Sequence, residues 1–155
     1  MSPTFELSTR RETEALAQRI APHLEPGDLL VLDGPLGSGK TFFTRALCRA
    51  LGLPKDVRVP SPTFTLVHEH ETRPPLSHAD LYRLSTPEQV RELGLDAQRE
   101  DGRLLVVEWG APYVDLLGGD ALVIRLSLDP RRAELIATGP RSSELLSAVT
   151  ERAVD

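Results

Sequence analysis

The chain has 155 residues, of which 40% are hydrophobic and 26% are charged, and its formal net charge at pH 7 is −5. This composition is typical of a soluble globular protein with one domain over 1–155, and no apolar run reaches the roughly 18 residues of a membrane helix. The acidic balance argues against a protein that grips nucleic acid with its own surface, because such binding depends on basic residues that neutralise phosphates.

The N-terminal part of the chain predicts a helix followed by a buried strand. Polar and apolar residues alternate too early for the apolar core of a secretory signal, so we expect no export signal and a cytoplasmic protein. Thr9 and Glu12 form a capping-box pattern ahead of apolar residues at helical spacing, which predicts a helix over 10–23. The apolar run 29–32 is typical of a strand buried on both faces, and it ends at Asp33.

The middle of the chain predicts two helices and two extended segments. Residues 42–51 have a helical pattern closed by a glycine, and they contain the single cysteine, Cys48, which cannot form an internal disulfide and so fits a reducing compartment. The threonine-rich stretch 57–70 is broken by prolines and predicts extended chain. Residues 76–82 predict a strand, and 85–94 predict a helix with a cap and a proline in its first turn.

The last part of the chain predicts a second buried strand and a hairpin. Residues 104–107 are fully apolar, and the β-rich segments 121–128 and 132–138 are joined by a short turn. Residues 141–155 predict a surface helix or a tail. Strands that alternate with helices, with continuous apolar runs in the middle, imply a mainly parallel sheet with helices on both faces. We therefore predict a three-layer α/β fold with an antiparallel C-terminal hairpin at one edge.

A glycine-rich motif follows the first apolar strand. Residues 34–41 read G-P-L-G-S-G-K-T and match G-x-x-x-x-G-K-[ST] at every fixed position, between a predicted strand and a predicted helix. Backbone N–H groups of such a loop point at phosphate oxygens, Lys40 adds charge near the β and γ phosphates, and Thr41 offers its hydroxyl to Mg²⁺. A glycine-rich turn with a solvated lysine is the alternative, but a chance match occurs in only about 1 in 200 chains of this length. The motif predicts a P-loop NTPase fold that binds a nucleoside triphosphate with Mg²⁺.

Two acidic residues lie at the ends of predicted strands. Magnesium on a nucleotide needs a second protein oxygen, which P-loop proteins usually take from an acid at the end of a neighbouring apolar strand. Glu108 directly follows the run 104–107 and is the better candidate, whereas Asp80 could lie near the same phosphates or position the attacking water. A solvated acid at a strand end is the alternative for both. His78 is more often a packed or hydrogen-bonded strand histidine than a catalyst.

Four sequence blocks share an order and spacing with one known family. They read G-P-L-G-S-G-K-T at 34–41, S-P-T-F-T-L-V at 61–67, H-A-D-L-Y-R-L at 78–84 and V-E-W at 107–109. The chain resembles the TsaE family of ATPases in bacterial tRNA threonylcarbamoyladenosine biosynthesis, over roughly residues 5–138. The first block alone indicates only an NTPase, and the second and third make the resemblance specific.

The resemblance implies a function and a set of site residues. Its members are ATP-hydrolysing accessory proteins of the TsaB–TsaD complex, which transfers a threonylcarbamoyl group to adenosine 37 of ANN-decoding tRNAs, so tRNA is reached only indirectly. The implied nucleotide contacts are Leu36, Gly37, Ser38, Gly39, Lys40, Thr41 and Phe42, with Thr13 and Arg132 near the adenine. The implied metal ligands are Thr41 and Glu108, and the implied catalytic residues are Asp80, Lys40 and Glu108. For Asp80 a metal-linked role is the alternative.

Two further elements acquire roles from the same resemblance. The segment 61–67 would act as a nucleotide-sensing switch, and the alternative is an ordinary threonine-rich edge strand. Trp109 is a candidate contact for the nucleotide or for the partner, and the alternative is a core tryptophan.

Other functions on the same fold stay open at this point. A small-molecule kinase would also bind ATP and Mg²⁺, but such enzymes usually carry arginine pairs in a lid, and few basic residues follow Gly102. A nucleotide-gated binding module would use the loop as a switch with little turnover. A measurement of phosphate release would separate the accessory ATPase, the kinase and the binding module. It would be made on the isolated protein, then with the partner complex and tRNA, and then with small hydroxyl substrates.

Overall fold

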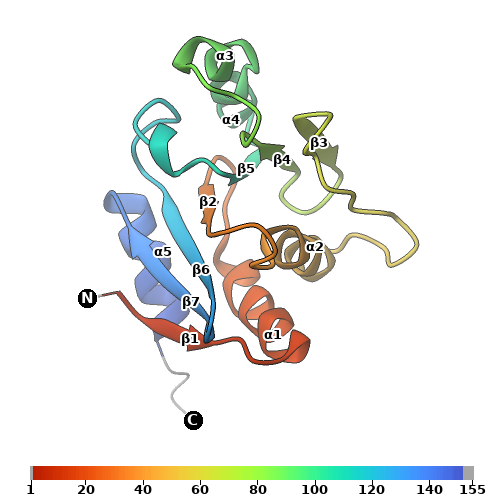
Figure 1. Cartoon of the computed structure of the whole chain (residues 1–155), viewed down its shortest axis with the longest axis vertical. Helices are drawn as coiled ribbons and strands as arrows, with labels where there is room; N and C mark the ends of the chain where they lie inside the picture. Colours follow the sequence, from red (N-terminus) through yellow and green to blue (C-terminus); the bar gives the residue numbers. More distant parts are fainter. Residues whose placement is uncertain (1, 152–155) are drawn as a thin grey trace.

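Seven strands form one mixed sheet in the computed structural model, which describes residues 2–151 (Figure 1). The strands are β1 (Thr4–Glu6), β2 (Leu29–Asp33), β3 (Val67–His70), β4 (Leu76–Asp80), β5 (Leu104–Glu108), β6 (Leu122–Leu128) and β7 (Arg131–Ala137). Their order across the sheet is β1-β7-β6-β2-β5-β4-β3. The central strands β6, β2, β5 and β4 run parallel, and β7, β1 and β3 pair antiparallel at the two sides.

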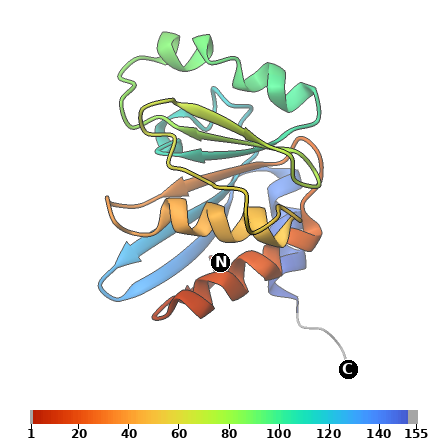
Figure 2. The same ribbon diagram turned by 90° about the vertical axis from the view of Figure 1, so that its right-hand side faces the viewer.

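Helices cover both faces of this sheet, as predicted. They are α1 (Arg10–Ile20), α2 (Lys40–Ala50), α3 (Pro87–Glu92), α4 (Leu95–Glu100) and α5 (Pro140–Thr150), with short 3-10 helices η1 (Ala21–His23) and η2 (Ala111–Tyr113). One hydrophobic cluster joins the sheet to α1, α2 and α5, and the other joins it to α3, α4 and η2. Figure 2 shows α1 and α2 side by side in front of the sheet. Within the described residues, every helix is too short or too polar to cross a membrane.

The alternation of side chains along β2 explains the two clusters. Leu30 packs in the cluster that contains Leu47 of α2, whereas Val31 packs in the cluster that contains Leu95 of α4. All three side chains from Leu30 to Leu32 are fully buried, because a parallel strand with helices above and below exposes neither face. Burial of each such side chain contributes about 1.5–3 kcal/mol, which is why the central strands appear in the sequence as continuous apolar runs.

The first helix and the phosphate-loop helix lie close to their predicted positions. The capping box is formed, since the Glu12 N–H donates to Thr9 Oγ1 at 3.2 Å and the Thr9 N–H donates to Glu12 Oε1 at 3.0 Å. Helix α2 begins at Lys40, two residues before the predicted start, because the glycine loop leads directly into it. The stretch predicted to be extended over 57–70 forms a strand only at Val67–His70. The prolines before it lack the N–H groups that a ladder requires.

Three features of the fold differ from the sequence prediction. The C-terminal hairpin is not at the edge of the sheet, because β1 pairs with β7 and its three residues are too few to give a recognisable pattern. The helix predicted over 85–94 was expected to end at Gly94, and a separate helix, α4, follows it. Gly94 has a φ of +69° and redirects the chain between α3 and α4. Residues 140–150 form α5, which buries Leu145 and Val149 in the core, while 152–155 lie outside the described residues.

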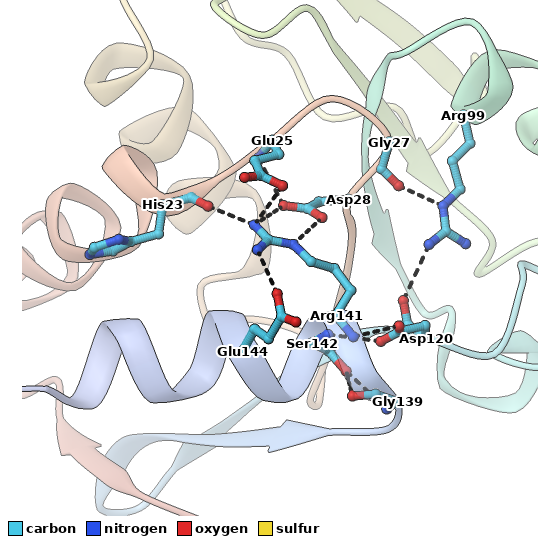
Figure 3. A network of polar contacts seen from close by, with 10 residues as sticks. All are labelled: His23, Glu25, Gly27, Asp28, Arg99, Asp120, Gly139, Arg141, Ser142 and Glu144. Carbon is cyan, nitrogen blue, oxygen red and sulfur yellow. Dashed lines mark hydrogen bonds and ion pairs between the residues drawn. The ribbon is translucent and has the colours of Figure 1, made fainter.

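A network of polar contacts fixes the N-terminus of α5 (Figure 3). Asp120 accepts hydrogen bonds from the N–H groups of Arg141 and Ser142, each at 2.8 Å, and thereby caps a helix whose own N-cap residue is Gly139. A side chain at Gly139 would meet the Asp120 carboxylate at 2.6 Å, so this approach requires glycine. The Arg141 guanidinium donates to both oxygens of Asp28, each at 2.9 Å. These contacts tie α5 to the turn that precedes β2.

Candidate nucleotide-binding site

The carboxyl ends of β2, β4 and β5 meet at one edge of the sheet. Asp80 and Glu108 are paired in register at the ends of β4 and β5, and Glu108 also lies at the end of β2, beside the glycine loop. A cleft of about 330 Å³ opens there, lined by the loop, Asp80, Glu108, Ser61, Thr63, Tyr82 and Trp109. In parallel α/β sheets ligands bind in such a crevice at the strand ends, so the fold brings the predicted site residues together where a ligand is expected.

The glycine loop has a backbone that only glycine accepts readily. Gly34, Gly37 and Gly39 have φ values of +145°, +80° and +102°. A side chain at Gly34 would lie 2.5 Å from the Leu126 carbonyl oxygen, so the loop packs tightly against β6. Ser38 Oγ is buried in the loop without a hydrogen-bond partner among the described residues. A buried hydroxyl without a partner at the start of a helix fits a loop that binds phosphate oxygens.

Lys40 is folded back into the loop. Its Nζ donates to the carbonyls of Gly34 at 2.6 Å and Pro35 at 3.0 Å, and it lies 4.1 Å from the centroid of the Trp109 ring. Burial lowers the pKa of Lys40, and the nearby carboxylates of Glu108, Asp80 and Asp33 oppose that shift. The ammonium is therefore held in the cleft by groups that phosphate oxygens can replace.

Thr41, Glu108 and His78 form a short chain of contacts at the bottom of the cleft. The Thr41 hydroxyl donates to Glu108 Oε2 at 2.9 Å, and His78 Nε2 lies 2.5 Å from the same oxygen. His78 is fully buried, and its Nδ1 has no partner among the described residues. A hydroxyl and a carboxylate are the hard oxygen ligands that Mg²⁺ prefers, so the donor set fits this ion. His78 is a hydrogen-bonded strand histidine, and it contacts Glu108.

Asp80 is oriented by the segment 61–67 and by its own turn. Its Oδ2 accepts a hydrogen bond from the Thr63 hydroxyl at 3.1 Å, and its Oδ1 accepts one from the Tyr82 N–H at 2.8 Å. Ser61 Oγ lies 2.8 Å from Thr63 Oγ1 and extends this chain of contacts. The Tyr82 ring packs on Trp109 with centroids 4.8 Å apart. Contacts from 61–67 thus reach the Asp80 carboxylate, which the sequence predicts to lie near the phosphates or to position the attacking water.

The two predicted adenine contacts are separated by the structure. Thr13 lines a second cavity of about 330 Å³ that adjoins the loop at Ser38, Gly39 and Phe42. Arg132 does not line either cavity; its Nε donates to Glu6 Oε1 at 2.9 Å on the other side of the hairpin. Arg131 lines the second cavity instead, because successive side chains of β7 point to opposite faces. The alternation along the hairpin was the signal that distinguishes these two arginines.

A mixed α/β sheet with a glycine loop after one strand and acids at the ends of its neighbours defines the class of P-loop nucleotide-binding proteins. The model of the family described as "Threonylcarbamoyl adenosine biosynthesis protein TsaE" matches residues 7–134. The chain belongs to this family, whose members are proteins of tRNA threonylcarbamoyladenosine biosynthesis.

Individual relatives match most of the chain. A TsaE protein of Rickettsia felis is 34% identical over 139 residues, which cover 89% of this chain and 80% of the relative. A TsaE protein of Streptomyces coelicolor is 42% identical over 115 residues, which cover 72% of this chain and 76% of the relative. The crystal structure of YdiB from Bacillus subtilis superimposes with a TM-score of 0.78 and 28% identity, covering 97% of this chain and 95% of YdiB.

Proposed function

We propose that this chain is a magnesium-dependent ATPase that assists the TsaB–TsaD complex in forming threonylcarbamoyladenosine at position 37 of ANN-decoding tRNAs. The observation that carries the proposal is the meeting of Lys40, Thr41, Glu108 and Asp80 in one cleft at the carboxyl ends of β2, β4 and β5. A cytoplasmic location belongs to the same proposal, because the tRNA and the ATP of a bacterial cell are found there.

Each residue of the cleft has a part in binding or in positioning. Lys40 would exchange the Gly34 and Pro35 carbonyls for β and γ phosphate oxygens, and Ser38 would gain a partner for its buried hydroxyl. Thr41 and Glu108 would hold Mg²⁺, which would offset the negative charge of the phosphates. Arg131 and Thr13, which line the adjoining cavity, would contact the nucleoside end of ATP.

Asp80 would position the water that attacks the γ phosphate. Its carboxylate has the orientation that the Tyr82 N–H and the Thr63 hydroxyl impose, with both oxygens fixed by donors. Catalysis of phosphoryl transfer depends mostly on positioning, so a carboxylate held in this way is suited to orient water. Because Thr63 belongs to 61–67, a change of that segment between the ATP and ADP states would change the orientation of Asp80 and the surface that a partner meets.

Phosphate release tests the proposal most directly. We expect slow release of phosphate by the chain with ATP and Mg²⁺, faster release with TsaB–TsaD and tRNA, and reconstituted modification of the tRNA only when the chain is present. Lys40→Ala should abolish binding of ATP, because it removes the only phosphate-directed side-chain charge inside the loop. ATP affinity and hydrolysis that are both unchanged in Lys40→Ala would overturn the phosphate-loop assignment. Phosphate transfer to a small hydroxyl substrate would instead identify a kinase.

A further inference from the structure

The side chain of Trp109 lies over the ammonium group of Lys40. Lys40 Nζ is 4.1 Å from the centroid of the Trp109 ring, and only 5% of Lys40 is exposed to solvent. The same nitrogen donates to the carbonyls of Gly34 and Pro35. An ammonium group carries three N–H donors, and two carbonyls with one ring face match that number. The chain itself therefore supplies a partner for each N–H group of Lys40.

The backbone fixes the position of the Trp109 ring. Trp109 directly follows β5, and its N–H donates to the Leu32 carbonyl of β2 at 3.1 Å. Its φ is +61°, a left-handed conformation that residues other than glycine seldom adopt. A residue in such a conformation persists only where the surrounding structure holds it, and such residues gather at functional sites. The strain at Trp109 accompanies a ring that is directed from the end of β5 onto Lys40.

Tyr82 and Gly110 restrict the ring further. The Tyr82 ring packs on that of Trp109 at a centroid distance of 4.8 Å, and the Tyr82 N–H donates to Asp80 Oδ1 at 2.8 Å. A side chain at Gly110 would meet Val107 Cγ1 at 2.8 Å, so the chain after Trp109 packs too closely on β5 to carry one. The ring thus belongs to the same set of contacts that orients Asp80.

The ring of Trp109 has two environments. Trp109 is partly buried and packs against the hydrophobic cluster on the α3 and α4 side of the sheet, and it also lines the cleft with Lys40. Burial lowers the pKa of Lys40, so its ammonium group needs partners that compensate for lost hydration. Phosphate oxygens compete with the Gly34 and Pro35 carbonyls for the same N–H groups. The negative face of the ring attracts the ammonium group and not a phosphate, so it stays a partner of Lys40 whichever oxygens the other donors meet.

We propose that Trp109 is a positioning residue for Lys40: the face of its ring holds the ammonium group inside the phosphate loop, where the phosphates of ATP bind. The inference rests on the proposed binding of ATP in this cleft. A cation–π contact between desolvated groups corresponds to roughly a 10- to 30-fold change in an equilibrium constant, so its loss should weaken ATP affinity by about that factor. Without the ring, the ammonium group would sample other positions, and binding of ATP would have to order it.

The test uses the single tryptophan of the chain, because fluorinated tryptophan supplied during expression replaces Trp109 alone. Each fluorine withdraws electron density from the ring face and weakens its attraction for a cation, with little change in size. Titration calorimetry with a non-hydrolysable ATP analogue and Mg²⁺ measures affinity for the protein with tryptophan, 5-fluorotryptophan and 5,7-difluorotryptophan. Trp109→Leu removes the ring, and Trp109→Phe keeps a smaller one. Phe5→Leu is the matched control, because it removes the ring from the pair of Arg19 and Phe5 outside the cleft.

Affinity should fall by about twofold for each fluorine, and Trp109→Phe should restore part of the affinity that Trp109→Leu loses, while Phe5→Leu stays close to wild type. A ring that only fills space would not respond to fluorine, so equal affinities for the three forms of tryptophan would overturn the inference. Lys40→Ala keeps the two proposals apart. Unchanged ATP affinity in Lys40→Ala contradicts the proposed function, whereas lost affinity in Lys40→Ala with no effect of fluorine contradicts only the positioning role of Trp109.

Discussion

Replacement of Asp80 by asparagine should separate nucleotide binding from chemistry. Asparagine has nearly the same size, and its oxygen can still accept the hydrogen bond from the Tyr82 N–H at the position of Oδ1. The amide group can occupy the position of Oδ2 and donate to the Thr63 hydroxyl, which now accepts. The substitution therefore keeps the local structure and removes the charge alone.

The structure sets the size of the two effects. A hydrogen bond to a charged group is worth about 1 kcal/mol more than a neutral one, so the loss of charge should change ATP affinity by less than about tenfold, or roughly 1.4 kcal/mol. Hydrolysis should fall by about 10²–10⁴, the usual contribution of a group that orients or activates the nucleophile. Lys40→Ala should instead act on binding, because the loss of the ammonium group should abolish ATP affinity itself.

The two quantities are measured by titration of a fluorescent ATP analogue and by single-turnover phosphate release at saturating ATP. Thr63→Val is the companion variant, because it keeps the Asp80 carboxylate and removes one of its two donors. It should reduce turnover less than Asp80→Asn and leave affinity near wild type. If Asp80→Asn abolishes affinity and the bound fraction still turns over at the normal rate, Asp80 is a binding residue and the assignment is wrong.

Three further predictions concern the proposed metal ligands, His78 and the cap of α5. Thr41→Ala and Glu108→Gln should weaken ATP binding in Mg²⁺ and leave binding in EDTA nearly unchanged, and equal losses in titrations under both conditions would remove them as metal ligands. His78→Phe should likewise reduce the gain in ATP affinity that Mg²⁺ produces, because Glu108 loses a hydrogen-bond donor. His78→Gln should restore part of that gain. ATP titrations with and without Mg²⁺, and with Mn²⁺ in its place, measure the gain for each variant. Asp120→Ala should lower the free energy of unfolding by about 1 kcal/mol at pH 7, since it removes the cap of α5. Burial raises the pKa of Asp120, but hydrogen bonds from Ser142 and the Arg141 N–H outweigh it and lower the folded-state pKa. The stabilisation is therefore fully present above the unfolded pKa of about 3.9 and is lost as the pH falls through the lowered folded-state pKa, so urea unfolding should show the largest difference between the two proteins at pH 7 and a shrinking difference below about pH 4.

The parts of the fold that the sequence predicts are those with a strong local cause. The runs 29–32 and 104–107 are apolar at every position because both faces of β2 and β5 are buried. The capping box fixes the start of α1 through contacts between Thr9 and Glu12, which are three residues apart in sequence. The glycine loop is equally local, since its strained φ values demand glycine at set positions. Such features depend on neighbours in sequence, so they can be recognised without knowledge of the fold.

Features that depend on partners far apart in sequence escaped prediction. Strand β1 forms because its residues pair with β7, more than 120 residues later in the chain. Helix α5 is capped by Asp120, which precedes the hairpin in sequence and is not adjacent to the helix in the chain. The resemblance places Arg132 near the adenine, but its side chain pairs with Glu6 while Arg131 lines the cavity beside the loop, because neighbouring strand residues point to opposite faces.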